Sequence, residues 1–284
     1  MLDNETEIDV FMITSNFDFP LNHPKTIVPE LPISSAGRQP LISVVTVVFN
    51  GAKTLRNTIE SIVPQLGDDV EYIIIDGGST DGTVDIVREH ERHLAYWISE
   101  RDSGIYDAWN KAIDVSRGKF ISFVGADDVL EPFACATYIE KIKSHPEIEY
   151  WSSRVVFGGR EGRVIGRPWR WHDFRRYMTV AHVGSLHRRD LFARYGKYNT
   201  TFRIAGDYEF LLRVGKNLKA GFADTVTARM GNGGISNTQA MLTLIETRSA
   251  KVSTKACNIP SANLDHAWAV AKLSARRLLS SYRK

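Results

Sequence analysis

The feature that most constrains this chain is a regular alternation of buried strands with amphipathic helices between residues 41 and 150. Residues 42–49 (ISVVTVVF) form an unbroken apolar run rich in β-branched residues, which is typical of a strand buried on both faces. The other predicted strands cover residues 70–75, 96–99 and 119–124, and the predicted helices cover residues 54–65, 83–91, 105–113 and 132–145. This spacing predicts an α/β fold with a mostly parallel, Rossmann-like sheet that is flanked by helices.

Composition and charge exclude several classes of protein. Hydrophobic residues make up 43% of the chain and charged residues 24%, which is ordinary for a globular protein. The two cysteines, Cys135 and Cys257, cannot build a disulfide framework or a zinc site made only of cysteine. A net charge of +3 is too small to predict binding to nucleic acid. The acidic N-terminus resembles no secretory signal and no apolar run approaches 18 residues, so we expect a cytoplasmic protein.

The regions outside this alternation differ in composition. Residues 1–40 hold five of the ten prolines, which fix φ and remove backbone donors, and this predicts an extended arm without chemistry. Beyond residue 150 the alternation weakens, and residues 158–170 predict a hairpin or loop. Residues 261–284 predict a basic amphipathic helix. That helix could contact an anionic membrane surface or pack on protein, and the sequence leaves both interpretations open.

Small or acidic side chains follow four consecutive predicted strands, at the sheet edge where ligands bind in open α/β folds. Asn50, Asp76 and Asp102 follow the first three strands, and the pair Asp127 and Asp128 follows the fourth. Adjacent carboxylates can hold Mg²⁺ or Mn²⁺ while phosphates complete the coordination shell. The alternative for the pair is an Asx turn before the next helix. For Asp76 in DGGSTDGT the alternative is a plain loop. The segment is neither a phosphate-binding loop of the Walker type nor a dinucleotide-binding G-x-G-x-x-G motif.

The segment AGDYEFLLR predicts a helix in which Asp207 shares an apolar face with Phe210 and Leu211. A carboxylate on such a face is costly unless it is paired, protonated or used, and burial raises its pKa toward that of a general base. The alternative is a salt bridge to Arg203 or Arg213.

Two aromatic side chains are further candidates. His182 in TVAHVGS lies between apolar residues and can be structural or functional. Trp169 in the segment WRW can stack on a sugar ring or pack under a loop, and we favour packing.

In order and spacing, the motifs SVVTVVFN, YIIIDGGSTDGT, SERDSGIYDAWNKAI and FVGADDVL resemble those of the family 2 glycosyltransferases. The later segment HVGSLHRRDLFARYGKYNTTFRIAGDYEFLLR is also similar, so the resemblance covers residues 41–234. It looks most like the subgroup that assembles O-antigen, capsule and exopolysaccharide. The resemblance implies a GT-A fold, a nucleotide-sugar donor, Mn²⁺ or Mg²⁺, and inversion at the anomeric carbon. It also implies a nucleotide-sugar half at residues 41–150, an acceptor and catalytic-base half at 151–240, and a helical extension at 241–284.

The resemblance implies roles for individual residues. Thr46, Phe49, Asn50, Asp76, Asp102, Asp107 and Asp127 would bind the nucleotide sugar, Asp128 the metal on its diphosphate, Asp207 would be the general base, and His182 and Trp169 would face the acceptor. Three departures stand out. Gly125 replaces a common Asn or Asp, Gly206 replaces a common Glu, and no Gln-x-x-Arg-Trp follows Asp207, which argues against a processive synthase.

The expected activity is therefore a single displacement by an inverting, metal-dependent, non-processive hexosyl- or N-acetylhexosaminyltransferase. A saccharide or lipid-linked saccharide would be the acceptor, UDP is the leading nucleotide, and the enzyme would work at the inner face of the cytoplasmic membrane. Two alternatives stay open. One is a sugar-phosphate nucleotidylyltransferase, for which VFNGAKTL supplies only Lys53 after the first strand. The other is a non-catalytic nucleotide-sugar-binding protein.

Overall fold

The computed structural model describes residues 39–158, 162–231 and 239–281. The predicted N-terminal arm of residues 1–40 therefore lies outside the described residues except for its last two. Of these, Gln39 donates a hydrogen bond to the carbonyl of Arg117, and the carbonyl of Pro40 accepts one from Lys119. The described chain thus begins where the first strand is anchored to the sheet.

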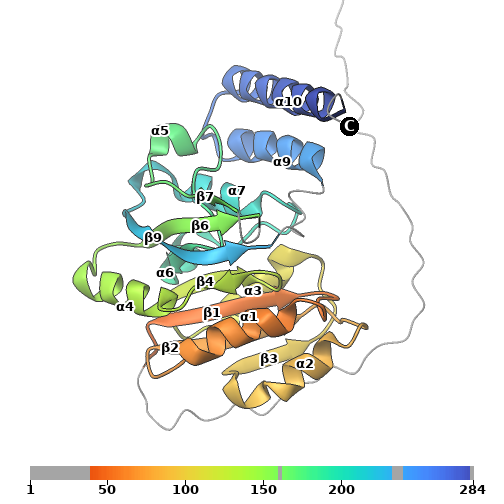
Figure 1. The fold of residues 1–284 in the computed structure, drawn as a ribbon. Coiled ribbons are helices and arrows are strands. Elements are labelled where there is room, and N and C mark those ends of the chain that lie inside the picture. Colours follow the sequence, from red (N-terminus) through yellow and green to blue (C-terminus); the bar gives the residue numbers. More distant parts are fainter. Residues whose placement is uncertain (1–38, 159–161, 232–238, 282–284) are drawn as a thin grey trace, which may run out of the picture.

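The strands of the described chain form one nine-stranded sheet that is continuous across both halves of the protein (Figure 1). Its order is β3 (Tyr96–Ser99), β2 (Val70–Asp76), β1 (Ile42–Val48), β4 (Phe120–Gly125), β8 (Ser185–Arg188), β6 (Tyr150–Phe157), β9 (Ala220–Met230) and β5 (Val129–Leu130), with β7 (Arg163–Ile165) paired to β6. The pairs among β1, β2, β3 and β4 are all parallel, which confirms the predicted sheet. Beyond β4 the pairs are antiparallel except for β6 and β9.

Strand β1 shows why the first half folds as it does. All seven of its residues are buried, because each face of the sheet is covered by helices. Val45 and Val47 belong to the core cluster that includes Trp109 of α3 (Ile105–Val115). Val44 and Val48 belong to the opposite cluster, which includes residues of α1 (Leu55–Ile62) and α4 (Ala134–Ser144). Alternate side chains of one strand therefore fill two cores, as the two-residue period of a strand requires.

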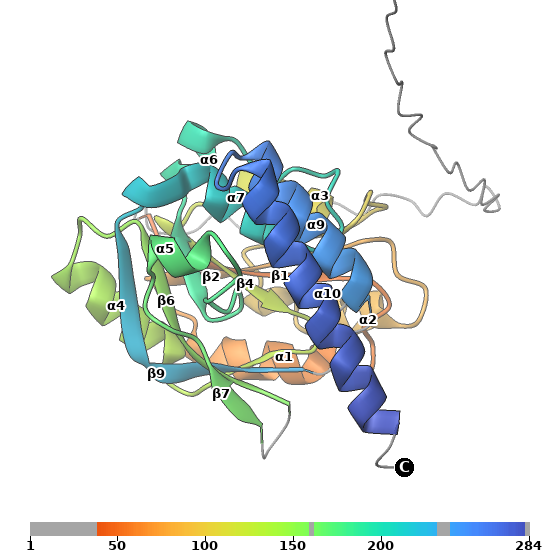
Figure 2. The same ribbon diagram turned by 90° about the horizontal axis from the view of Figure 1, so that it is seen from above.

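The remaining helices lie before β3 and beyond β6 in the chain. They are α2 (Thr83–Glu89), α5 (Trp171–Phe174), α6 (Asp190–Tyr195), α7 (Gly206–Val214), α9 (Ala240–Ser253) and α10 (Ile259–Ser281). Helices α2 and α7 begin and end within two residues of their predictions, and α10 begins two residues earlier than predicted. Helix α5 lies in a segment where no helix was predicted, and no separate range was predicted for α9 within the helical extension. The hairpin expected at residues 158–170 is present as the pairing of β7 with β6. Helix α9 packs against α7, and α10 lies across α9 at the end of the molecule (Figure 2).

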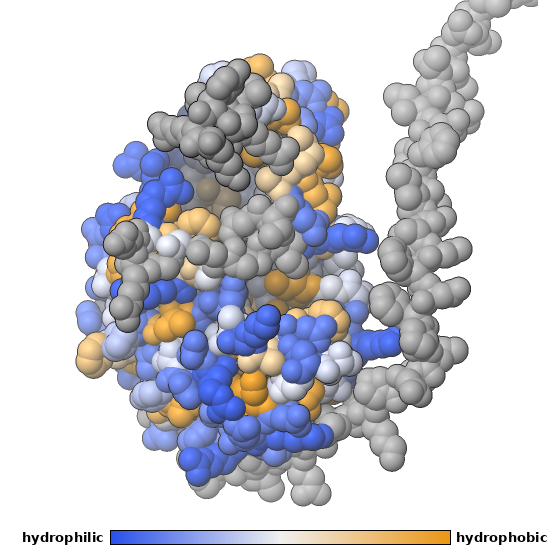
Figure 3. Space-filling view, turned by 45° about the vertical axis from the view of Figure 1, so that its right-hand side comes forward, coloured by the Kyte–Doolittle hydropathy of each residue, from blue (hydrophilic) through white to orange (hydrophobic). Residues whose placement is uncertain are grey.

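The C-terminal helix differs from its predicted amphipathic arrangement. Leu264 and Trp268, which lie four residues apart on the apolar face of the predicted amphipathic helix, are 70% and 62% exposed. The helix is held to the protein instead by Ala262, which is fully buried, and by Asp265, which contacts Lys251 and Arg176. Apolar side chains consequently reach the surface at the α9–α10 end (Figure 3). Across the described residues, none of the helices combines the length and apolar character needed to cross a membrane.

Candidate active site

Asp76 ends β2 with one carboxylate oxygen satisfied and the other unpaired. Its Oδ2 accepts hydrogen bonds from the backbone N–H groups of Gly78 and Ser79, at 3.1 and 3.0 Å, and from the Ser99 hydroxyl at 2.6 Å. Its Oδ1 is buried and has no hydrogen-bond partner among the described residues. A buried acceptor without a donor is costly, so this oxygen is available to a ligand N–H such as that of a nucleobase.

The loop after β1 lies against the loop after β2. Asn50 adopts a left-handed conformation with φ of 52° and accepts a hydrogen bond from the Thr80 N–H at 2.9 Å. Phe49 beside it is 66% exposed. A Cβ on Gly77 would lie 2.5 Å from Asp102 Oδ2 and 3.5 Å from the Phe49 ring, so the glycine is what lets these side chains approach. The ends of three strands therefore meet around one exposed aromatic ring.

Asp102 and Asp107 shape the turn into α3. Asp102 Oδ1 accepts a hydrogen bond from the Gly104 N–H at 2.9 Å, and Asp107 Oδ2 accepts one from the Ser103 N–H at 2.9 Å. Burial raises the pKa of Asp102 above its ordinary value. The structure does not bring Thr46 to this group: its side chain is fully buried within β1, and its hydroxyl accepts a hydrogen bond from the Tyr72 hydroxyl at 3.0 Å.

Asp128 follows β4 in a pocket that is built by two glycines. Its Oδ2 accepts a hydrogen bond from the Gly125 N–H and its Oδ1 one from the Gly231 N–H, both at 3.0 Å. A Cβ on Gly125 would lie 2.7 Å from Asp128 Oδ2, and one on Gly231 would lie 2.3 Å from Asp127 Oδ2. The glycine at 125 therefore has a physical reason: its backbone serves the carboxylate, and the site has no room for a side chain there.

The paired carboxylates fit a divalent cation. Burial, together with the neighbouring charge of Asp127, raises the pKa of Asp128 to about 6, as expected for a carboxyl group that lacks a compensating positive charge. Within the part of the chain that the structure describes, no cluster of three or more His, Cys, Asp or Glu side chains could hold a metal alone. Asp127 and Asp128 would thus supply one or two oxygens, and the phosphates of a ligand and water would supply the others, as is usual for Mg²⁺.

Asp207 lies in the first turn of α7, on the other side of α3. Its Oδ1 accepts hydrogen bonds from the Tyr208 N–H at 2.8 Å and from the Tyr106 hydroxyl at 3.3 Å. Burial raises its pKa to about 6. The alternative of a salt bridge does not hold, because Arg213 pairs with Glu209 at 3.0 Å and no other Lys or Arg among the described residues lies within ion-pair distance of Asp207.

His182 lies beside Asp207 but is not its counterion. The His182 Nδ1 atom is 3.9 Å from Asp207 Oδ2, and the imidazole stacks on the rings of Trp109 and Phe123, with centroids at 4.5 and 5.3 Å. Those two rings also contact each other, with centroids at 4.9 Å. Neither ring nitrogen has a hydrogen-bond partner among the described residues. Burial lowers the pKa of His182 to about 3, so the imidazole is neutral. Trp169 packs on Phe174, with centroids at 4.2 Å, which agrees with the packing interpretation.

Two of these groups connect the halves of the site. Tyr106 lies four residues after Asp102 in the chain, and its hydroxyl contacts both Asp207 and the carbonyl of Ile204, the latter at 2.6 Å. Phe123 lies four residues before Asp127 and stacks on His182. Short stretches of α3 and β4 therefore link the strand-end carboxylates to the region of Asp207.

Sequence reasoning missed Glu246, which comes from α9. Its carboxylate is buried and accepts hydrogen bonds from the N–H groups of Arg203, Ile204 and Ala205, at 2.9, 2.8 and 2.9 Å. These are the residues that lead into α7, so Glu246 fixes the helix start on which Asp207 stands. No signal in the sequence marks it, because it lies some 40 residues away in a region outside the predicted motifs.

Comparison with known sequences gives a consistent result. The family model described as "Glycosyl transferase family 2" matches residues 43–206. A "PGL/p-HBAD biosynthesis glycosyltransferase" of Mycobacterium bovis (strain BCG / Pasteur 1173P2) is 32% identical over 209 residues, which are 70% of this chain and 80% of that protein.

Comparison with solved structures shows the same fold. The structure of TarS from S. aureus in complex with UDP-GlcNAc superposes with a TM-score of 0.63 at 14% identity, over 81% of this chain and 71% of that one. The structure of glucosyl-3-phosphoglycerate synthase from Mycobacterium tuberculosis, with Mn²⁺, UDP and glucosyl-3-phosphoglycerate, superposes with a TM-score of 0.55 at 16% identity, over 75% and 80% of the two chains.

Proposed function

The chain belongs to the family 2 glycosyltransferases, and we propose that it is an inverting, metal-dependent and non-processive member. It moves a hexosyl or N-acetylhexosaminyl group from a nucleotide sugar to a hydroxyl of a saccharide or lipid-linked saccharide, in cell-surface polysaccharide biosynthesis. Residues 41–150 bind the donor, residues 151–240 bind the acceptor, and residues 241–284 support the acceptor half. The observation that carries the proposal is Asp207, a buried carboxylate with a raised pKa and no cationic partner among the described residues.

The donor side supports a nucleotide with a ring N–H, and UDP is our leading candidate. The unpaired Oδ1 of Asp76 can accept that N–H, and the exposed ring of Phe49 can stack on the base. Asp102 and Asn50 lie in the same group of loops. The similar structures of TarS and glucosyl-3-phosphoglycerate synthase contain UDP-GlcNAc and UDP.

The carboxylates of Asp127 and Asp128 would hold the metal, with Mn²⁺ or Mg²⁺ as the candidates. When bound there, a divalent cation supplies positive charge for the diphosphate that leaves with the nucleotide. The backbone N–H groups of Gly125 and Gly231 hold the Asp128 carboxylate in place, and the missing Cβ at Gly231 leaves room for the Asp127 carboxylate. The similar synthase from Mycobacterium tuberculosis contains Mn²⁺ together with UDP.

Asp207 takes the proton of the acceptor hydroxyl while the hydroxyl oxygen attacks the anomeric carbon from the face opposite the nucleotide. One C–O bond forms, the bond to the diphosphate breaks, and the configuration inverts. A pKa of about 6 keeps Asp207 ionised at neutral pH while leaving it basic enough to accept the proton. The Tyr106 hydroxyl orients the carboxylate, and the neutral imidazole of His182 keeps cationic charge away from it.

Helix α10 is our candidate for peripheral contact with an anionic membrane surface, where a lipid-linked acceptor would lie. Leu264 and Trp268 are exposed one turn apart, and Lys272 lies 5.0 Å from the Trp268 ring. Exposed aromatic and aliphatic side chains next to basic ones suit the interface of an anionic bilayer. Co-sedimentation with vesicles of anionic and of neutral lipid tests this, with Leu264→Ala/Trp268→Ala as the variant; equal sedimentation of both proteins would reject it.

A panel of UDP-, GDP- and dTDP-sugars tests the function, with released nucleoside diphosphate as the readout. We expect nucleoside diphosphate to be released from at least one donor, and this release to depend strictly on a divalent cation. The Asp207→Asn variant should lose the release. Asp85→Asn, which removes a 75% exposed carboxylate of α2, is the matched control and should retain activity. Release of pyrophosphate would instead indicate a nucleotidylyltransferase, and absence of release with nucleotide still bound would indicate a binding protein.

A further inference from the structure

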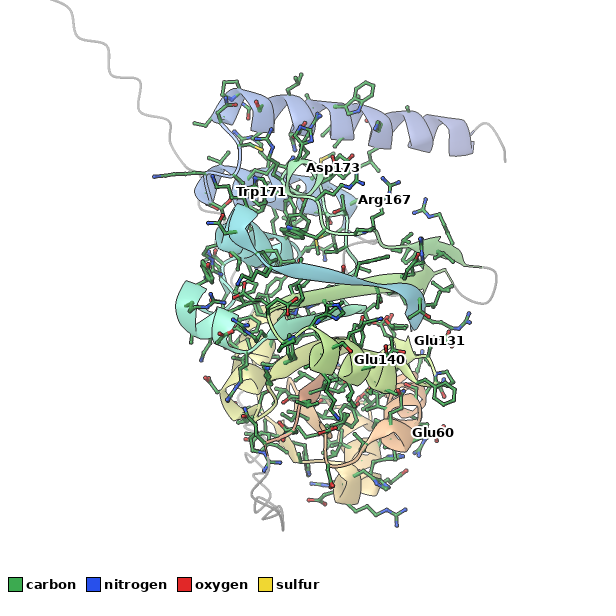
Figure 4. The ribbon with its side chains drawn as sticks, turned by 90° about the vertical axis from the view of Figure 1, so that its left-hand side faces the viewer. Glu60, Glu131, Glu140, Arg167, Trp171 and Asp173 are labelled. Carbon is green, nitrogen blue, oxygen red and sulfur yellow. The ribbon has the colours of Figure 1, made fainter. Side chains whose placement is uncertain are left out.

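A cavity of about 630 Å³ lies within the proposed acceptor half and is lined by none of the candidate site residues described above. Its walls are Arg154 of β6, the β7 strand with Arg163, the following residue Arg167, and residues 177–181. Figure 4 shows Arg167 between α10 and the strands β6 and β9, at the level of α5. The volume is that of an ordinary small-molecule site. We call this cavity the arginine pocket.

The arginine pocket carries positive charge that the protein does not neutralise. Arg154 forms an ion pair with Asp224. Arg163 and Arg167 have no carboxylate within ion-pair distance in the part of the chain that the structure describes, and no Asp or Glu is among the described residues that line the pocket. Two guanidinium groups face one concave site, and this arrangement suits a phosphate or carboxylate, which a guanidinium can bind through two parallel hydrogen bonds.

The pocket also presents a buried hydroxyl and a fixed backbone. The Thr179 Oγ1 atom lies in its wall, is buried, and has no hydrogen-bond partner among the described residues. A buried hydroxyl without a partner is costly, and a ligand oxygen would satisfy it. Gly166 has φ of 102°, and a Cβ on it would lie 2.2 Å from the Ser153 carbonyl, so this residue holds the chain tightly against β6 just before Arg167. The charged residue therefore projects from a rigid support.

The position of the pocket relates it to the reaction. Residues 179–181 form one of its walls, and the next residue in the chain is His182, whose Nδ1 lies 3.9 Å from Asp207 Oδ2. Consecutive Cα atoms are about 3.8 Å apart, so the end of the pocket is close to the base. The pocket is therefore next along the chain to the side chain beside Asp207, and an acceptor that spans the two places would have its reacting hydroxyl at one end and its anionic group at the other.

We propose that the arginine pocket binds an anionic group of the acceptor, either a phosphate or diphosphate ester or a sugar carboxylate. The inference rests on the proposed function, because it takes Asp207 as the group that meets the acceptor hydroxyl. It adds that the acceptor is an acidic molecule and that Arg163 and Arg167 select it. A neutral saccharide could accept hydrogen bonds in the pocket but would leave the charge of both guanidinium groups uncompensated.

Calorimetry on the full-length protein tests the proposal without knowledge of the natural acceptor. Two pairs of probes are titrated in EDTA, so that the metal-dependent donor site does not contribute. The first pair is geranyl diphosphate and geraniol, and the second is methyl glucuronide and methyl glucoside. At least one anionic probe should bind tenfold or more tightly than its neutral partner. A preference for the diphosphate would identify a lipid-diphosphate acceptor, and a preference for the glucuronide would identify an acidic sugar.

The double variant Arg163→Gln/Arg167→Gln should lose this preference, because each charge-assisted pair is worth about tenfold in affinity. Arg92→Gln, which changes an exposed arginine on the donor half, is the matched control and should keep it. The proposal is overturned if neither anion binds better than its neutral partner, or if the double variant binds the anion as well as the unchanged protein does.

A parallel titration with UDP and Mn²⁺ separates this proposal from the proposed function. The double variant should bind UDP as tightly as the unchanged protein. If it loses UDP binding, the arginine pocket belongs to the donor site and the acceptor assignment is wrong. If the unchanged protein does not bind UDP or any other nucleoside diphosphate, the proposed function fails, while the anion titrations still report on the pocket itself.

Discussion

Replacing Asp207 by Asn should make the protein inactive and more stable at the same time. The Asp207 side chain is only 18% exposed, and no Lys or Arg among the described residues compensates its charge. An Asn side chain has almost the same volume, and its Oδ1 can still accept the hydrogen bonds from the Tyr208 N–H and the Tyr106 hydroxyl. The substitution therefore removes the negative charge and the basic oxygen, and leaves the packing in place.

The size of the stabilisation follows from the pKa. Burial raises the pKa of Asp207 from 3.8 to about 6, a shift of about 2 units, and each unit corresponds to about 1.4 kcal/mol. Because the folded state holds this proton more tightly than the unfolded state, the contribution of Asp207 to stability is complete below pH 4 and is lost as the pH rises through 6. At pH 8 the ionised group therefore costs about 3 kcal/mol, which Asp207→Asn should recover.

Urea unfolding of both proteins at pH 8 and pH 5 measures this gain. We expect about 3 kcal/mol at pH 8 and roughly half as much at pH 5, where part of the penalty is relieved by protonation. For a chain of this size the gain at pH 8 corresponds to roughly 5 °C in the melting temperature. In the transfer assay, release of nucleoside diphosphate should fall by about 10²- to 10⁴-fold, the usual contribution of a general base.

Glu209→Gln is the contrasting control in the same helix. Glu209 is also buried, but it is paired with Arg213, so its neutralisation should destabilise the protein at pH 8. An Asp207→Asn variant whose stability gain were the same at both pH values, or which were less stable than the unchanged protein at pH 8, would refute the idea that the fold bears the cost of an ionised base. Undiminished transfer would refute the base assignment itself.

Three further substitutions test other parts of the site. Glu246→Ala leaves three backbone N–H groups without their acceptor, so urea unfolding should show a loss of about 2–4 kcal/mol and the transfer rate should fall more than UDP affinity. Asp76→Asn should weaken UDP binding about tenfold in calorimetry with Mn²⁺, because an amide presents a donor where the ligand N–H needs an acceptor. Gly231→Ala places a Cβ 2.3 Å from Asp127 Oδ2, so the Mn²⁺ concentration that half-saturates UDP binding should rise.

The first half of the fold could be predicted from the sequence because its signals are local. The residues of β1 form an unbroken apolar run, and the helices between the strands repeat their apolar residues at helical spacing. Strand β8 carried no such signal. It has only four residues, and it is a strand because it pairs with β4 on one side and β6 on the other. Strands that are so distant in sequence pair only when the whole protein folds, so their pairing leaves no periodic pattern of apolar residues in the local sequence.

The same division applies to the candidate site. The rule that ligands bind at the carboxyl ends of parallel strands located Asp76 and Asp128. It could not supply Gly231, whose N–H reaches Asp128 from 103 positions along the chain. Asp207 is largely buried, as predicted, but the apolar helical face on which that prediction rested explains the burial only in part. Helix α7 has no single apolar stripe, since Glu209, two positions after Asp207, is buried as well.

The C-terminal extension contacts residues of the proposed acceptor half, although it lies outside the residues that the family model matches. Glu246 of α9 holds the start of α7, and Lys251 of the same helix, only 3% exposed, is paired with Asp265 of α10 at 3.0 Å. Asp265 also binds Arg176 at 2.8 Å, and the next residue, Tyr177, lines the arginine pocket. A buried charge is tolerated only while its partner stays in place. The extension therefore contacts two parts of the proposed site: Glu246 holds the start of the helix that carries Asp207, and Asp265 holds the residue before Tyr177 of the arginine pocket.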